Sequence, residues 1–378
     1  MKVTRPDYFE KFRCIGSACT DNCCIGWEID IDPSSMNFYR SVPGEFGSRL
    51  SKCISADDPS HFILERERCP FLNAQNLCDI ILTLGEEHLC AICAEHPRFY
   101  EWLGDQKEAG LGLCCEAAAK LILEQKSPVT FQTFTTQEPT EPCGADPQVI
   151  SSLLKIRSYF LQILQARSLP IPSRIARVLY DSEKLQTALE SEDFSYLDHF
   201  VSNSAKRQPQ ILPLHPICSQ QWELLDPILS FYEALEPFSP AWINRLQQVH
   251  TNLRAVLEAC PHFLAVYSDS LYQYENLCVY FLFRYFMKAA FDYDILSKVK
   301  MIAVSFLILG VLDTQTWLTN QNFSFQHQIE IVKAYSKEIE YSEENLQTLF
   351  EAFWENEFFS QTALLSLLSC FLPFSENS

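Results

Sequence analysis

The chain of 378 residues is long enough for roughly two or three domains. Apolar residues make up 47% of it and charged residues 20%, which excludes a disordered chain. The formal net charge of −19 disfavours direct binding to nucleic acid, because that binding depends on positive charge on the protein. A basic protein partner suits this charge better, although acidity by itself also serves solubility.

The N-terminal residues, MKVTRPDYFEKFRC, contain no apolar segment typical of a targeting signal, so we expect a cytoplasmic protein. No apolar run approaches the roughly 18 residues that a membrane-spanning helix needs. The longest run, at 301–312, predicts a buried helix, and we expect no membrane span.

Residues 1–125 form the first predicted unit, an irregular cysteine-rich metal-binding module. Eleven of the sixteen cysteines lie within the first 115 residues. In a cytoplasmic protein this density points to metal binding rather than to disulfides. We expect metal ligands, rather than a large core, to hold this unit together. It should contain several loops and one short strand at 27–32, where apolar and polar residues alternate.

Residues 126–147 are a predicted linker, because they are rich in Pro, Thr and Gln. Alternation within 129–136 predicts one short strand inside it. Residues 148–378 form a predicted domain of roughly eight helices, so the fold class is mainly α. Apolar residues recur at helical spacing in Val149, Leu153, Ile156, Phe160 and Ile163, and near 175–190, 220–235, 242–260, 274–290, 296–312, 325–340, 342–356 and 361–371.

Nine cysteines are the candidate metal ligands, because thiolates are strong, soft ligands for iron and zinc. Within the first group the intervening residues number 4, 3 and 0, and within the second 8, 11 and 2, which is not the pattern of a zinc finger, ribbon or RING. A supply of cysteine alone fits an iron–sulfur cluster held by four thiolates, with zinc as the alternative metal and buried structural thiols as the remaining interpretation. The candidates are Cys14, Cys19, Cys23, Cys24, Cys69, Cys78, Cys90, Cys93 and Cys115.

Adjacent cysteines rarely bind one ion together. One of Cys23 and Cys24 therefore fits better at a second site or in packing. The nine candidates leave room for a second metal site or for redox-active thiols. Isolated cysteines further along the chain, such as Cys260 on an apolar helix face, are interpreted as small core residues.

Several other residues admit both a functional and a structural interpretation. His88 and His96 are interpreted as surface or loop histidines rather than ligands. Trp27 either shields a cluster from water or packs in the core. Arg98 either donates hydrogen bonds to a cofactor or forms a surface ion pair. Glu275 either sits at a helix start, where a negative charge is favourable, or binds a substrate lysine.

The common nucleotide and metalloenzyme motifs are missing from the sequence. It contains no GxxxxGK[ST], no GxGxxG after a strand and no HExxH. The radical-type spacing of three cysteines is also missing, because Gly26 occupies the third position after Cys19 and Cys23. Catalytic residues and cofactor-binding residues therefore stay unassigned.

Four segments resemble the flagellin lysine N-methylase family, which belongs to the wider CxxCxxCC-type zinc- or iron-chelating domains. They are RPDYFEKFRCIGSACTDNCCIGWEIDID at 5–32, CPFLNAQNLCDIILTLGEEHLCAICAEHPR at 69–98, GLGLCCEAAAKLIL at 110–123 and ENLCVYFLFRYF at 275–286. The specific segments cover about residues 5–123. Where the family usually has Ser-Cys-Pro-Glu, this chain has Cys-Cys-Glu-Ala from Cys114, so Cys115 aligns with the family cysteine. The ligand assignment at this pair stays open.

The resemblance implies a [4Fe–4S] cluster and methyl transfer from S-adenosylmethionine to lysine side chains of flagellin. The residues by themselves indicate an acidic, cytoplasmic, cysteine-ligated metal protein with a helical domain. The alternative hypothesis is a non-catalytic metal-binding or redox-sensing adaptor, which the missing S-adenosylmethionine motif favours.

Overall fold

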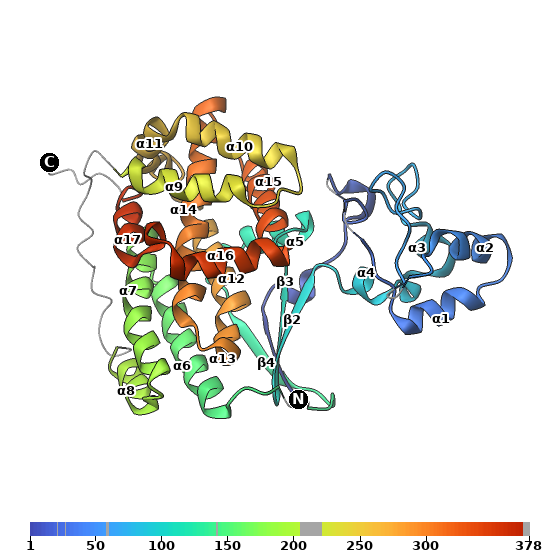
Figure 1. The fold of residues 1–378 in the computed structure, drawn as a ribbon, viewed down its shortest axis with the longest axis horizontal. Helices are drawn as coiled ribbons and strands as arrows, with labels where there is room; N and C mark the ends of the chain where they lie inside the picture. Colours follow the sequence, from blue (N-terminus) through green and yellow to red (C-terminus); the bar gives the residue numbers. More distant parts are fainter. Residues whose placement is uncertain (21, 27, 58–59, 141–142, 205–220, 373–378) are drawn as a thin grey trace.

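In the computed structural model a helical body and a smaller lobe lie side by side, and a four-stranded sheet lies between them at the edge of the body (Figure 1). Helices α1–α4 form the lobe and helices α6–α17 form the body. The predicted mainly α fold class is confirmed. The structure describes residues 1–20, 22–26, 28–57, 60–140, 143–204 and 221–372.

The sheet has the strand order β2-β3-β1-β4. Strand β1 pairs in parallel with β3 and antiparallel with β4, so it joins residues that are far apart in the sequence. Strands β2 and β3 form a hairpin that turns at Gly104, whose φ of +69° favours glycine. The strand predicted within 129–136 is confirmed as β4. The strands are β1 Lys2–Pro6, β2 Arg98–Leu103, β3 Gln106–Leu111 and β4 Phe131–Thr135.

The lobe contains short helices connected by irregular segments. Helix α1 begins with Pro33 behind Asp32, whose carboxylate accepts a hydrogen bond from the Ser35 N–H, a favourable helix start. The strand predicted at 27–32 is wrong: among the described residues of that segment only Asp30 forms a bridge, to His61, and Trp27 lies outside the described residues. The helices are α1 Pro33–Ser41, α2 Gly44–Cys53, α3 Asp79–Leu84 and α4 Ala91–Glu95.

The body follows most of the predicted apolar stripes. The stripe at 242–260 spans two helices, because the backbone leaves helical geometry at Asn252. Helix α8 was not predicted. The helices are α6 Pro147–Leu164, α7 Ile171–Glu190, α8 Phe194–Ser204, α9 Trp222–Ala234, α10 Pro240–Thr251, α11 Leu253–Val266, α12 Tyr272–Tyr285, α13 Ala289–Asp292, α14 Ile295–Asn320, α15 Phe325–Tyr335, α16 Glu343–Glu355 and α17 Gln361–Ser369, with a π-helix at Ser336–Glu340 after α15.

Helix α14 is long and apolar enough to cross a membrane by length and composition. Its most apolar 18-residue window is nevertheless completely buried inside the protein, where α14 packs against α7, α11 and α12. A helix that is apolar on all sides is typical of the centre of a large helical domain. The apolar run predicted to be a buried helix at 301–312 therefore lies in the central helix of the body.

Two clusters of buried hydrophobic side chains stabilise the chain. The larger one fills the body and also includes Leu103 and Leu111 from the sheet and Leu123 from helix α5 (Glu116–Leu123). The smaller one lies in the lobe, and Cys69 and Cys90 are among its buried members. The sheet and α5 thus share the core of the body, while the predicted division at 126–147 stays a prediction.

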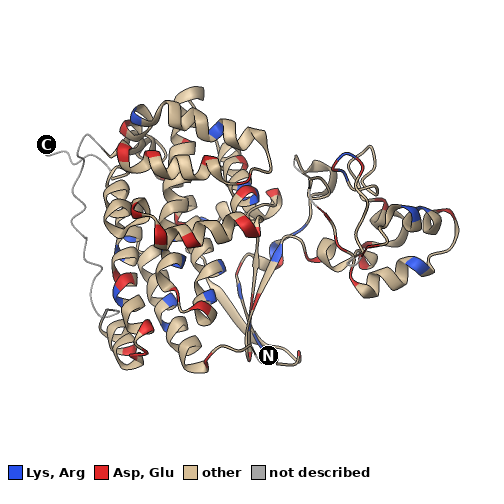
Figure 2. Ribbon diagram, in the orientation of Figure 1, with Lys and Arg blue, Asp and Glu red and all other residues tan. Residues whose placement is uncertain are grey.

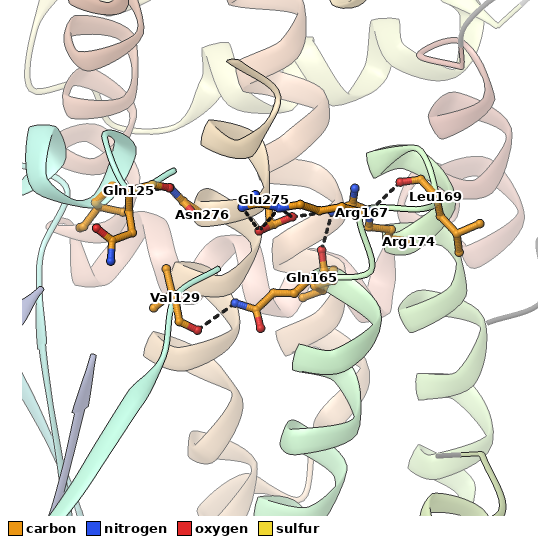
Figure 3. Close-up of polar contacts among 10 residues, drawn as sticks. Gln125, Val129, Gln165, Arg167, Leu169, Arg174, Glu275 and Asn276 are labelled. Atoms are coloured by element: carbon orange, nitrogen blue, oxygen red, sulfur yellow. Dashed lines mark hydrogen bonds and ion pairs between the residues drawn. The ribbon is translucent and has the colours of Figure 1, made fainter. Parts of the chain in front are cut away.

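Helix α12 carries a buried carboxylate that holds the turn between α6 and α7 (Figure 3). Glu275 is 1% exposed and accepts hydrogen bonds from Arg167 (Nη2 to Oε1, 2.8 Å) and Arg174 (Nη1 to Oε2, 2.7 Å). Arg174 also donates to the carbonyl oxygens of Leu164 and Leu169. Glu275 is therefore a structural anchor with both oxygens paired, and it does not present a free carboxylate to a substrate lysine.

The next residue of α12 ties the body to helix α5. The side-chain nitrogen of Asn276 donates to the carbonyl oxygens of Ile122 and Gln125, both at 2.9 Å. Gln165 similarly donates to the carbonyl oxygen of Val129, just before β4 (Figure 3). These bonds fix the C-terminal end of α5, and the N-terminal end of the same helix follows Cys115.

We predict that Glu275→Gln destabilises the protein by about 3–5 kcal/mol, because it leaves the buried Arg174 without a compensating charge. The matched control is Lys155→Gln, which breaks an ion pair with Asp198 whose two side chains are each 50% exposed. This control should cost less than about 1 kcal/mol. Denaturant unfolding of both variants checks the difference, and equal losses would contradict the structural role of Glu275.

A second prediction concerns Asp313, a buried residue of α14 that accepts a hydrogen bond from the Tyr274 hydroxyl. Burial raises the pKa of Asp313 to about 7, against the opposing effect of the hydrogen bond from Tyr274. The folded state therefore holds a proton that the unfolded chain, with an Asp pKa of about 3.9, releases. This contribution to stability is complete below the unfolded pKa and is lost as pH rises toward 7.

We expect the parent protein to lose thermal stability between about pH 4 and pH 7 relative to Asp313→Asn, which cannot titrate but keeps an acceptor for Tyr274. Thermal unfolding of both proteins across this range gives the comparison. Parallel pH profiles would show that Asp313 stays charged in the folded state.

Candidate metal centre

Five of the nine candidate cysteines lie together in the lobe. The Cys69 N–H donates to the Cys24 carbonyl oxygen at 2.8 Å, which brings the first cysteine segment against the second. An isolated bridge between Leu72 and Cys78 closes the turn that follows Cys69. The thiols of the group interact electrostatically with one another. We call this group the lobe thiols: Cys24, Cys69, Cys78, Cys90 and Cys93.

Helix starts position three of the candidate ligands. Cys78, Cys90 and Cys115 are the residues directly before α3, α4 and α5. Backbone N–H groups of α3 and α5 donate to the sulfur atoms of Cys78 and Cys115, and each of these bonds lowers the thiol pKa. Free N–H groups at a helix start favour a thiolate, so these positions suit metal ligands. The sequence signal for this arrangement is the short helical segment that follows each of these cysteines. The sequence-based prediction did not include these helices.

Burial keeps most of these thiols protonated in the absence of a compensating positive charge. Burial raises the pKa of Cys69 to about 11 and also raises the pKa of Cys78. The hydrogen bond between Cys90 and Cys93 lowers the pKa of Cys90 and raises that of Cys93. A thiolate in this environment needs a nearby cation, and a soft metal centre provides one.

The described thiols are spaced more widely than the ligands of one tetrahedral ion. Sulfur atoms around one tetrahedral zinc, with Zn–S bonds of about 2.3 Å, lie about 3.8 Å apart. Among the described residues, no three thiols have their sulfur atoms all within 4.8 Å of one another.

The described residues contain one group with single-ion spacing, and it lies outside the cysteine set. Donor atoms of Glu28, Asp30 and His61 lie within 4.8 Å of one another. His61 lies 3.4 Å from Glu28 through Nε2 and 3.1 Å from the Ser55 hydroxyl through Nδ1. Both carboxylates are exposed, and such groups are common on protein surfaces without an ion.

The other four candidates are Cys14, Cys19, Cys23 and Cys115. The Cys23 thiol hydrogen-bonds to the thiol of its neighbour Cys24, and the Cys115 thiol interacts electrostatically with the thiols of Cys19 and Cys23. Cys14 is exposed, and its sulfur accepts a hydrogen bond from the Gly16 N–H. The metal-ligand role of all nine cysteines stays a proposal, while their grouping is a property of the fold.

The pair Cys114–Cys115 is divided between two environments. Cys114 is buried beside Tyr341, and burial raises its pKa to about 12. Cys115 is partly buried and faces Cys19 and Cys23. Cys115 is thus the member of the pair that lies with other candidate ligands.

The two histidines near the second cysteine segment contact aromatic side chains. The His88 ring stacks on Phe38 at a centroid distance of 4.1 Å. His96 is half-buried beside Tyr341, and its pKa is lowered to about 4 by burial and by Lys337. These contacts agree with their interpretation as structural residues.

Arg98 and Asp32 support the lobe from outside the cysteine set. Arg98 donates to the Ala94 carbonyl oxygen and lies over the rings of Phe9 and Phe12, so it packs at the base of the lobe. Asp32 accepts a hydrogen bond from the Ala91 N–H at 2.8 Å, which ties the start of α1 to the start of α4 beside Cys90. Burial would raise the pKa of Asp32, but hydrogen bonds from Ser34, Ser35 and Ala91 hold it well below its usual range.

Comparison with known proteins places the chain in a family. The model of the FliB lysine N-methylase C-terminal domain matches residues 157–367, most of the helical body. Two proteins named lysine-N-methylase, from Salmonella typhimurium (strain LT2) and Salmonella choleraesuis (strain SC-B67), are each 28% identical over 149 residues, which is 35% of this chain and 37% of each relative. The flagellar biosynthetic protein FliU of Salmonella muenchen is 30% identical over 129 residues, 32% of this chain and 76% of that protein.

The match thus spans little more than a third of the length of the two lysine-N-methylases. No solved structure matches the chain. The matched family model nevertheless covers more than half of the chain, and its bounds run from within α6 to the last turn of α17. The protein therefore belongs to the FliB lysine N-methylase family.

Proposed function

We propose that the protein is a protein-lysine N-methyltransferase that methylates lysine side chains of flagellin, with S-adenosylmethionine as methyl donor. The observation that carries the proposal is the family match over residues 157–367. The names of the relatives support it further, since two are lysine-N-methylases and one is a flagellar biosynthetic protein.

The proposed reaction makes one demand on the site before the methyl group moves. A free lysine has a pKa of about 10.4, so its ammonium must first give a proton to a base or to water. The lone pair of Nζ then forms a bond to the methyl carbon. The carbon–sulfur bond of the donor breaks, and its electron pair stays on sulfur. Glu275 is unsuited to act as this base, because its carboxylate is already paired with Arg167 and Arg174.

The proposed metal cofactor is a [4Fe–4S] cluster, with zinc as the alternative, and the lobe thiols fit it by number and by type. They offer five cysteine sulfur atoms, and such a cluster takes four. When bound, an iron–sulfur cluster can exchange single electrons and can hold several chain segments together. The lobe supplies the sulfur atoms, and Asp32 orients the helix that begins after Cys90.

The proposed substrate and location suit the charge of the protein. Acidic residues are distributed over the helical body and the lobe, with basic residues interspersed (Figure 2). The formal net charge of −19 attracts a lysine-bearing protein segment and repels nucleic acid. We propose a cytoplasmic enzyme, and the burial of α14 supports its assignment as a core helix rather than a membrane span.

We predict that the anoxically purified protein incorporates labelled methyl groups from S-adenosylmethionine into flagellin. Cys23→Ser with Cys24→Ser should abolish this incorporation and lower the iron content, because serine keeps the size of cysteine but binds soft metals poorly. The matched controls are Cys260→Ser and Cys370→Ser, since both residues are buried in the body. They should retain incorporation within a few-fold of the parent.

Full incorporation by an iron-free Cys23→Ser, Cys24→Ser variant would remove the cluster from the proposed function. Lack of incorporation by a parent protein that contains its metal would instead favour the non-catalytic adaptor hypothesis.

Metal removal should unfold the lobe and leave the body folded. The lobe core is small and includes Cys69 and Cys90, whereas the body has a large apolar core of its own. We expect chelation under reducing conditions to expose the segment around 28–93 to protease, while the helical circular dichroism of the body persists. A lobe that stays as protease-resistant as before chelation would refute metal-coupled folding.

A further inference from the structure

A pocket opens on the surface of the body where the start of α6 meets helix α13. Its volume is about 640 Å³, within the range of roughly 300–1,000 Å³ that is typical of ligand sites. Residues 143–147 line it from the side of α6, and Ala290, Phe291 and Tyr293 line it from the side of α13. Helix α13 packs against α6, so both walls belong to the helical body.

Aromatic side chains form the wall on the side of α13. Phe291 is 44% exposed, so much of its ring faces solvent. Tyr293 directly follows α13 and has a φ of +58°. A bulky residue rarely adopts this left-handed conformation, and such outliers gather at binding sites and other functional segments. Gln186 holds the backbone there by donating a hydrogen bond to the Tyr293 carbonyl oxygen at 2.9 Å.

Carboxylates accompany these aromatic side chains. Asp146 is exposed on the side of α6, where its Oδ1 accepts a hydrogen bond from the Gln148 N–H at 2.7 Å and begins the helix. Asp292 lies between the two aromatic residues in the chain and pairs with Lys298 at 2.6 Å. The Asp292 side chain is 47% exposed and that of Lys298 only 4%, so the pair presents its carboxylate to solvent.

This combination matches the chemistry of a lysine side chain. The aliphatic part of a lysine packs on apolar surface while its ammonium stays at the polar edge. An aromatic face attracts an ammonium within about 6 Å, and a neighbouring carboxylate adds charge–charge attraction. An anionic ligand would instead be repelled by the carboxylates and by the net charge of −19.

We propose that this pocket binds a lysine side chain of the protein substrate, with the aliphatic chain against Phe291 and Tyr293 and the ammonium beside Asp146. The identity of that substrate rests on the proposed function, whereas the preference for an ammonium rests on the residues of the pocket. Binding here holds a lysine-bearing segment on the body, and it assigns no step of methyl transfer to these residues.

The test measures binding of a fluorescein-labelled pentalysine peptide to the full-length protein by fluorescence anisotropy at low salt. Asp146→Asn removes the charge, while asparagine still caps the helix. Phe291→Ala removes the exposed ring. Each change should weaken binding about two- to fivefold, and the double variant should weaken it about tenfold.

Matched controls make the same substitutions elsewhere on the surface. Asp193→Asn also removes an exposed carboxylate at a helix start, where Asp193 accepts a hydrogen bond from the Tyr196 N–H at 2.9 Å. Phe238→Ala also removes an exposed ring, which is 54% exposed in the parent. Both controls should bind pentalysine within about twofold of the parent. Circular dichroism checks that every variant is folded, and if Asp146→Asn failed to fold, Phe291→Ala and its control would still decide the question.

Four outcomes would overturn the proposal. Unchanged binding in the pocket variants would show that the peptide binds elsewhere, and equal weakening in the controls would show general charge attraction. Undiminished binding of pentalysine with acetylated side chains would show that no ammonium is recognised, because acetylation removes the charge. Lack of binding by the parent would leave the pocket without this ligand.

The same measurements separate this proposal from the proposed function. A parent protein that binds pentalysine through the pocket but transfers no methyl groups to flagellin would contradict the proposed function and leave the lysine pocket standing. A protein that methylates flagellin, with binding and transfer unaffected in the double variant, would keep its function and lose the pocket.

Discussion

We propose that the lobe depends on metal bound to its cysteines, because its apolar core is much smaller than the core of the body. A short set of side chains around Ile29, Tyr39, Phe62 and Phe71 forms that core, and sulfur atoms complete it. A buried thiol stabilises a fold as a small hydrophobic group does. Thiolates bound to one metal would in addition hold the ends of loops together and so offset the conformational entropy that loop closure costs. Cys78 and Cys90 each lie directly before a helix, and their thiols interact electrostatically with each other.

The body supports the boundary with the lobe through one helix. The first turns of α12 hold the α6–α7 turn through Glu275 and the end of α5 through Asn276. Its last turns carry Tyr280 and Arg284, which meet the buried Glu340 of the π-helix at 2.8 and 3.1 Å. Single-turn π-helical segments often mark functional sites. This helix contains most of the segment at 275–286 that resembles the family. Its polar residues are found in the core because they form the hydrogen bonds and ion pairs just described.

Helix α5 connects the candidate metal ligands to the helices of the body. Helix α5 begins directly after Cys115, and the carbonyl groups at its other end accept hydrogen bonds from Asn276, so one short helix connects Cys115 to the core of the body. Glu116 and Lys333 add a contact between α5 and α15. A displacement of Cys115 would therefore also move α5, which is bonded directly to α12 and α15.

The sequence by itself determined the features that depend on neighbouring residues. Helical stripes such as Val149 to Ile163 and the alternation in β4 are local patterns, and the structure contains both elements. The family followed from short segments of fixed spacing, and comparison with known proteins confirmed it.

Only the tertiary structure decided which distant residues meet. Strands β2 and β3 were missed because β3 pairs with β1, about 100 positions earlier in the chain. The grouping of Cys115 with Cys19, and the pairing of Glu275 with Arg174, likewise join residues about 100 positions apart. Local sequence patterns report burial and backbone preference, but they do not specify which surfaces pack together, because that depends on the packing of the whole chain.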